Sequence, residues 1–186
     1  QMPTARFRET GSVSASISHV QPYNRISIMF QPLDWLEGGF RYTEIRNRKY
    51  GPEDFSGDQT FKDKSIDFKL RLLKESERLP ALAIGMRDLG GTSLFSGEYL
   101  VASKRHGDWD ATLGMGWGNL ASRGGFFNPF SYVFTDKFDD RSPSGNTTSD
   151  VNSGNYFRGE TSLFAGVEWH SQDRQLTPKS ARLCTR

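Results

Sequence analysis

The stretch from Pro80 to Gly118 constrains the fold most, because polar and apolar side chains alternate there with a period of two. This period places successive side chains on opposite faces of a β-strand. It predicts three strands, separated by turns at residues 90–92 (Gly-Gly-Thr) and 106–108 (His-Gly-Asp), whose composition is typical of tight reversals. One face of this meander is apolar and the other carries charges, hydroxyls and glycines. In the middle strand we expect Tyr99 and Val101 on the apolar face and Glu98 on the polar face.

The same alternation recurs on both sides of this stretch. It predicts further strands in the ranges 11–20, 25–31, 35–44, 65–73 and 156–169. The predicted fold class is therefore all-β, an antiparallel meander of about eight long strands. We expect one segment over residues 1–169, with long loops at 46–63 and 119–155, followed by an irregular tail at 170–186.

Strand length points toward a membrane. Several predicted strands have close to ten residues, which spans about 33 Å at roughly 3.3 Å per residue. A transmembrane strand needs about nine to eleven residues, whereas strands of soluble proteins average about five or six. No apolar run reaches the roughly 18 residues of a membrane-spanning helix. The sequence thus predicts a transmembrane β-barrel or part of one, with long loops on one side and short turns on the other.

A soluble β-barrel or sandwich that binds a carbohydrate or a lipid is the alternative. The two differ in the direction of one set of apolar side chains, which would face lipid in a membrane barrel and a closed core in a soluble protein: Ile66, Phe68, Leu70, Leu113 and Met115. Aromatic residues near the strand ends suit either an interfacial girdle or core packing, and the sequence leaves both open. They are Trp35, Tyr42, Tyr99, Trp109, Trp117, Tyr156 and Trp169.

The polar face supplies the candidate binding residues. A charged lumen that contacts a polar, anionic glycan is one interpretation, and a solvated sheet face balanced by cross-strand ion pairs is the other. The candidate lumen-facing or glycan-facing residues are Arg41, Asp67, Lys69, Arg71, Arg87, Glu98 and Lys104.

Composition and motifs argue against several other functions. The net charge of +2 gives no electrostatic basis for nucleic-acid binding. The single cysteine, Cys184, excludes an intrachain disulfide, and the three histidines are too scattered for metal-ligand spacing. We therefore expect no metal, no cofactor and no catalytic residues, and we predict that the protein is not an enzyme. A glycan-modifying enzyme would need a pair of carboxylates, such as Asp67 and Glu98, facing each other in a cleft.

Four stretches resemble a known family: PTARFRETG, SHVQPYNRISIMFQPLDWLEGGFRYTEI, the long stretch from Phe61 to Gly118, and YFRGETSLFAGVEW. They are similar to the YjbH-type outer-membrane proteins linked to exopolysaccharide and capsule production, most specifically over Gly85–Arg105. The resemblance runs from about Pro3 to Trp169. It implies a β-barrel of the bacterial outer membrane that assists synthesis or export of an extracellular polysaccharide. The implied partners are outer-membrane lipid, the polysaccharide and other exopolysaccharide-secretion proteins.

Members of that family are several times longer, and their N-termini are exported and often lipid-anchored. The N-terminus here lacks the apolar region of a signal peptide, and the tail after Trp169 departs from the family. We therefore expect the chain to be a piece of a larger barrel.

Overall fold

Eight consecutive strands form a single antiparallel sheet in the part of the chain that the structure describes. That part, in a computed structural model, comprises residues 2–89, 94–122, 125–134, 136–141 and 155–170. The spatial order of the strands is their order in the sequence. Their bounds are β1 Val13–Val20, β2 Tyr23–Leu33, β3 Leu36–Lys49, β4 Thr60–Leu73, β5 Ala81–Arg87, β6 Gly97–His106, β7 Trp109–Trp117 and β8 Thr161–Trp169. The predicted all-β meander is confirmed.

Short helical segments lie in two of the connections. They are α1 Glu53–Ser56, η1 Gly118–Ala121, α2 Pro129–Val133 and η2 Asp136–Phe138. None of the helices in the described ranges has the length and apolar character needed to cross a membrane.

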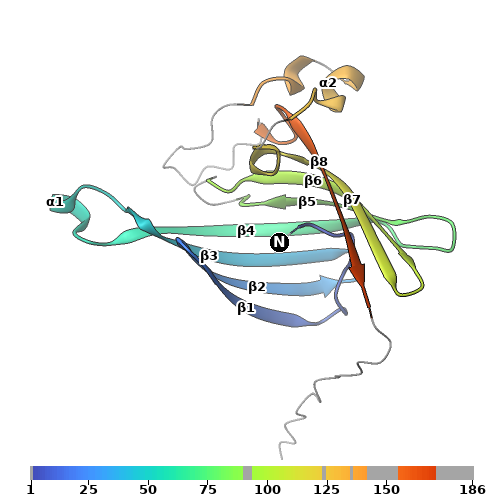
Figure 1. The fold of residues 1–186 in the computed structure, drawn as a ribbon, viewed down its shortest axis with the longest axis horizontal. Coiled ribbons are helices and arrows are strands. Elements are labelled where there is room, and N and C mark those ends of the chain that lie inside the picture. The colour runs from blue at the N-terminus through green and yellow to red at the C-terminus, as the bar shows by residue number, and fades with distance from the viewer. Residues whose placement is uncertain (1, 90–93, 123–124, 135, 142–154, 171–186) are drawn as a thin grey trace, which may run out of the picture.

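The sheet curls into a half-barrel, with β7 and β8 running steeply across the direction of the first strands (Figure 1). The rings of Tyr23, at the start of β2, and Phe95, just before β6, lie 6.1 Å apart across the concave side. Within the described residues, β1 and β8 each pair with one neighbour only, so the sheet has two open edges.

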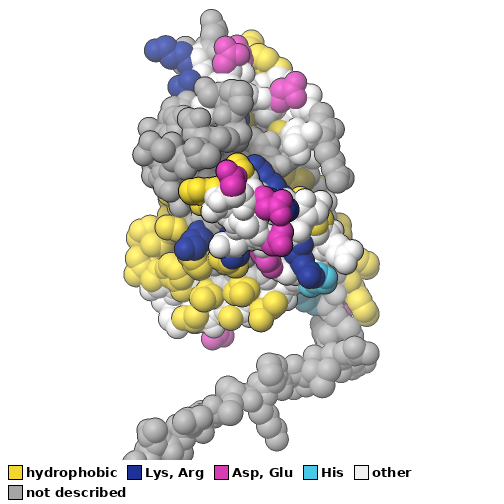
Figure 2. All heavy atoms as spheres, turned by 90° about the vertical axis from the view of Figure 1, so that its left-hand side faces the viewer, with side chains coloured by type: hydrophobic (Ala, Val, Ile, Leu, Met, Phe, Trp, Pro, Cys, Tyr) yellow, Lys and Arg dark blue, Asp and Glu magenta, His cyan; other side chains and the backbone are white. Residues whose placement is uncertain are grey.

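The two faces of the sheet have opposite character. On β4, Asp67 and Lys69 face the concave side and are only 6% and 7% exposed. Ile66 and Leu72 face the convex side and are 50% and 53% exposed. Hydrophobic side chains gather along the lower rim in Figure 2, while acidic and basic side chains lie nearer the centre of that view. On β4 the buried side chains are therefore polar and the exposed ones apolar, whereas the core of a water-soluble protein is mainly apolar.

The connections at the two ends of the half-barrel differ in length. At one end they comprise residues 34–35, 74–80 and 107–108. At the other end they comprise residues 21–22, 50–59, 88–96 and 118–160. We call these the short-turn end and the long-loop end. The first long loop is shorter than the predicted 46–63, because β3 continues to Lys49 and β4 already starts at Thr60. The predicted turn at 90–92 and tail residues 171–186 lie outside the described residues.

An N-terminal strap, residues 3–8, crosses the concave face. The backbone N–H of Ala5 donates a 3.0 Å hydrogen bond to the Ser103 hydroxyl. The methyl group of Ala5 joins a small apolar cluster whose other members come from β5 and β6: Ala81, Ala83, Tyr99 and Val101. Phe7 and Phe164 pack against this cluster. The strap therefore extends an apolar cluster that β5 and β6 form on the concave face.

Five of the seven aromatic residues near the strand ends divide into two groups, while Tyr42 and Tyr156 are half-buried. Trp35, Trp109 and Trp169 are exposed at the short-turn end, and Trp109 pairs with Trp169 in register. Tyr99 and Trp117 are buried, and Trp117 stacks on Phe130 of α2 with ring centroids 5.1 Å apart. Tyr99 and Trp117 therefore pack within the protein, whereas an interfacial girdle of the three exposed tryptophans stays a prediction.

Glycines in β7 leave part of the concave face without side chains. Gly114 lies opposite Phe164 of β8, and a Cβ atom on Gly114 would come within 2.2 Å of the tip of that ring. The ring covers the glycine backbone, a pairing that compensates for glycine in strands. These glycines are structural, as their spacing inside a strand indicates.

Candidate functional site

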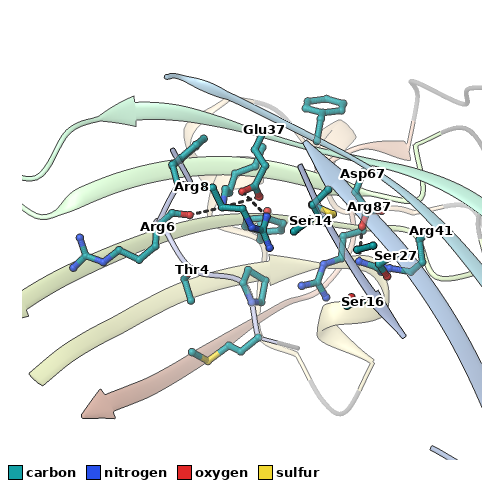
Figure 3. Close-up of a pocket in the computed structure, with 18 residues that line it drawn as sticks. Thr4, Arg6, Arg8, Ser14, Ser16, Ser27, Glu37, Arg41, Asp67 and Arg87 are labelled. Atoms are coloured by element: carbon teal, nitrogen blue, oxygen red, sulfur yellow. Dashed lines mark hydrogen bonds and ion pairs between the residues drawn. The ribbon is translucent and has the colours of Figure 1, made fainter. Parts of the chain in front are cut away.

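A polar trough along the concave face is the candidate site. It consists of two cavities of about 480 Å³ and about 440 Å³. Both are lined by Ser16, Ser27, Arg41 and Arg87, so they join into one elongated space. Figure 3 shows the larger cavity, with Arg41, Arg87 and Asp67 at one end and the N-terminal strap at the other.

Alternation brings the basic groups of the trough together. Arg41 pairs across strands with Ser27 on one side and Ser65 on the other, so these three residues share the concave face. An Nη atom of Arg41 lies 2.5 Å from a carboxylate oxygen of Asp67. Arg87 follows Gly85 on the same face of β5, one pair further along the sheet.

The N-terminal strap engages two of the predicted residues. The Lys69 ammonium group donates a 2.6 Å hydrogen bond to the carbonyl oxygen of Arg6 and lies 3.0 Å from the Glu37 carboxylate. The Arg71 guanidinium lies 4.4 Å from the centroid of the Phe7 ring, as does the Lys69 ammonium group. Lys69 and Arg71 thus hold the strap in place.

Two arginines in the second half of the strap form further ion pairs. Arg6 pairs with Glu75 in the β4–β5 connection and forms two 2.7 Å hydrogen bonds to Asp110 of β7. Arg8 lies 3.0 Å from Glu37 of β3. These contacts join residues far apart in the sequence, and alternation within a strand gives no sign of them.

Glu98 and Lys104 are not on the concave face, and their predicted orientation is wrong. Register pairs Glu98 with Met86 and places Gly97 opposite Arg87, so Glu98 points to the convex side. There it is buried under the segment after β7, where Arg141 contacts its carboxylate at 2.7 Å and 3.1 Å. Lys104, on the same side, donates hydrogen bonds to carbonyl oxygens of the β4–β5 connection, including that of Glu77 at 3.1 Å.

The same register reverses the predicted orientation of Tyr99 and Val101, which face the concave side. Both faces of this part of β6 are apolar, because Leu100 and Ala102 alternate with them. The polarity of the side chains therefore does not show which face of β6 is concave. The prediction relied on Glu98 and Lys104, which lie on the convex face.

Prediction from sequence omitted several residues of the trough. Arg25 on β2 shares the concave face with Ser27, and alternation along β2 could have found it. Its guanidinium carbon lies 5.0 Å from the ring centroid of Tyr23 and 5.5 Å from that of Phe95. The serines of β1 contribute Ser16, whose position in an alternating serine row is visible in the sequence.

The carboxylates are not arranged as a facing pair. Asp67 lies on the concave face and Glu98 on the convex face, so the sheet separates the two groups considered for a glycan-modifying enzyme. In the ranges that the structure covers, no three His, Cys, Asp or Glu residues are placed to hold a metal ion.

The sequence matches the model of the YjbH family, described as "Exopolysaccharide biosynthesis protein YbjH", over residues 1–179. The chain belongs to the YjbH family. The match continues beyond Trp169, so the predicted limit of the resemblance is too short. The chain is also 45% identical over 180 residues to a protein of Escherichia coli (strain K12) named "Uncharacterized lipoprotein YjbH". This alignment covers 96% of the chain and 26% of that relative, so the chain spans about a quarter of the relative's length. No solved structure matches the chain.

Proposed function

We propose that this chain forms part of the wall of an outer-membrane β-barrel that assists synthesis or export of an extracellular polysaccharide. One observation carries the membrane part of the proposal. The convex face exposes apolar side chains on strand after strand, while charged and hydroxyl groups are buried on the concave face. Exposed apolar patches on soluble monomers rarely exceed a few hundred Å², and larger ones mark a partner or a membrane.

The height of the apolar surface fits a bilayer. On β8, Leu163, Ala165, Val167 and Trp169 follow one another on the convex side. The six steps along the chain from Leu163 to Trp169 cover roughly 20 Å, close to the apolar band of about 25 Å in outer-membrane barrels. Exposed tryptophans at the short-turn end match the aromatic girdles of such barrels.

The lengths of the connections predict which end of the half-barrel faces each side of the membrane. In outer-membrane barrels short turns lie on the periplasmic side and long loops outside the cell. We infer that residues 107–108 face the periplasm and that residues 118–160 face outward. The open edges of β1 and β8 would then pair with further strands of a longer chain, as edge strands with unpaired backbone groups require.

The polysaccharide part of the proposal rests on the family description and on the polar trough. We infer a structural and transport role, with the trough as a surface along which sugar hydroxyls find hydrogen-bond partners. A soluble sandwich would enclose Ile66 and Leu113, and both are at least half exposed, at 50% and 58%. This exposure favours the membrane barrel over the soluble alternative.

Membrane flotation tests the proposal. The chain, produced with an export signal in a Gram-negative host, should float with outer-membrane vesicles in a density gradient and migrate differently on a gel before and after heating. In a strain that lacks its full-length family member, extracellular polymer should fall while intracellular polymer rises. A chain that stays monomeric in buffer without detergent would contradict the membrane assignment.

A further inference from the structure

One end of the trough concentrates positive charge. The cavity of about 440 Å³ is lined by Arg25, Arg41 and Arg87, and no acidic side chain of the described residues lines it. These arginines come from three different strands, β2, β3 and β5, so the fold rather than local sequence brings them together. The Asp67 carboxylate in the adjoining cavity supplies one negative charge near these three positive charges. Like charges in a partly buried cavity repel one another, so binding of a further anion would be favourable.

The guanidinium groups of Arg25 and Arg41 retain the capacity to bind a ligand. Arg25 lies over the rings of Tyr23 and Phe95, and no carboxylate in the described part of the chain forms an ion pair with it. Arg41 contacts Asp67 through one Nη atom, and a guanidinium group has five N–H donors. Arginine binds carboxylates through two parallel hydrogen bonds, a geometry that lysine cannot reproduce.

The rest of the lining suits a sugar. The hydroxyl groups of Ser16, Ser18 and Ser27 lie along the same cavity and can both donate and accept hydrogen bonds. The neighbouring cavity of about 480 Å³ shares four lining residues with this one, so a ligand longer than one residue can continue along the concave face. Both volumes are in the range of ligand pockets, about 300 to 1,000 Å³.

We propose that Arg25, Arg41 and Arg87 form a subsite for the carboxylate group of an acidic polysaccharide, with adjacent sugar hydroxyls bound by the serines of β1 and β2. This inference rests on the proposed function and names the class of glycan. Arg25 and Arg41 contact the carboxylate, and the Asp67 carboxylate orients Arg41. The strap lies at the far end of the trough and bounds the space available to the polymer.

Calorimetric titration of the detergent-solubilised chain tests the subsite with two probes of equal length. Trigalacturonate carries a carboxylate on each sugar, and maltotriose carries none. We expect heat of binding with trigalacturonate only, with an affinity that falls as salt rises, because exposed ionic contacts are screened. Arg25→Gln should weaken binding about tenfold, and Arg25→Lys should weaken it about threefold, because lysine retains the charge without the paired donors.

Arg78→Gln is the matched control, since Arg78 is exposed in the β4–β5 connection and its replacement changes net charge equally. It should leave the affinity unchanged. Equal binding of the two probes, no binding of either, or an Arg25→Gln chain that binds normally would overturn the subsite. Displacement of trigalacturonate by inorganic phosphate at the same concentration would also overturn it, since a simple anion site would then suffice.

The same preparations are tested for membrane flotation. Normal flotation with failed titration rejects the subsite alone, whereas failed flotation rejects the proposed function.

Discussion

Adjacent residues of β4 differ more in solvent exposure and polarity from each other than from residues on the same face several strands away. Ile66 is exposed on the convex face and Asp67 is buried on the concave face, although they are adjacent in the chain. On β7, Leu113 is likewise exposed on the convex face and the adjacent Thr112 is buried on the concave face. At these positions of β4 and β7, whether a side chain is buried is therefore set by which face it occupies, and the buried residues are the polar ones. In the proposed barrel, the convex face would meet an apolar medium and the concave face would enclose a hydrated or ligand-filled space.

The sharpest test of this comparison uses two adjacent residues of β1. Ile17 is 82% exposed on the convex side, and Ser16 lines the trough. Ile17→Arg should destabilise membrane insertion by about 2 to 4 kcal/mol, the cost of arginine facing lipid near the bilayer centre. Flotation and heat-modifiable migration measure the loss.

Ser16→Arg introduces the same charge on the concave side and should leave insertion intact. Equal behaviour of the two variants would show that the faces do not differ in environment.

The strap offers the next largest effect. Arg6→Ala removes both hydrogen bonds to the buried Asp110 and the ion pair with Glu75. We expect a loss of about 2 kcal/mol in the free energy of unfolding, because a buried carboxylate loses its main partner. Denaturant titration followed by tryptophan fluorescence measures it.

Arg105→Ala serves as the control for the strap. Arg105 is exposed and lies 3.5 Å from the same carboxylate, so its removal should cost well under half as much. A strap that contributes nothing to stability would give equal, small effects for both variants.

Replacement of Gly114 tests packing on the concave face. Gly114→Ala places a methyl group where the Phe164 ring lies, and we expect a loss of about 1 to 2 kcal/mol in the free energy of unfolding from overpacking. Phe164→Leu in the same chain should recover part of that loss, which a double-mutant cycle measures. Additive effects would show that the ring does not cover the glycine.

Acidification should have the smallest effect. The backbone N–H of Arg105 and the Arg6 guanidinium lower the pKa of Glu75 below its ordinary value of 4.5. A lowered pKa in the folded chain means that the carboxylate stabilises the fold above pH 4.5 and that this contribution disappears as pH falls through the folded-state value. Unfolding titrations between pH 6 and pH 3 should show this loss in the native chain and a flatter profile in Glu75→Gln.

Sequence alone predicted the sheet well because alternation is a local property. On β4 the outward set of Ile66 and Leu72 and the inward set of Asp67 and Lys69 follow directly from residue order. On β6 the prediction failed, because Tyr99 and Leu100 are both apolar and neither face is distinguished. Five of the seven candidate site residues lie on the concave face for the same local reason.

The remaining features depend on contacts between distant segments. Arg6 meets Glu75 and Asp110 only after the sheet has curled, and Arg141 reaches Glu98 only after the segment following β7 folds back. The spacing of these residues in the sequence does not predict these contacts. The convergence of three arginines likewise follows from register between strands, which the sequence of each strand does not specify.

Three of the four tryptophans lie exposed at the short-turn end, and the fourth, Trp117, is buried near the long-loop end. Tryptophan fluorescence can therefore report how deeply the short-turn end lies in a bilayer. Lipids brominated at successive carbons along the acyl chain should quench this emission with a depth profile set mainly by one rim of the half-barrel. Trp117 supplies a shielded reference signal, so the depth of that rim in the bilayer is measurable without attaching any label.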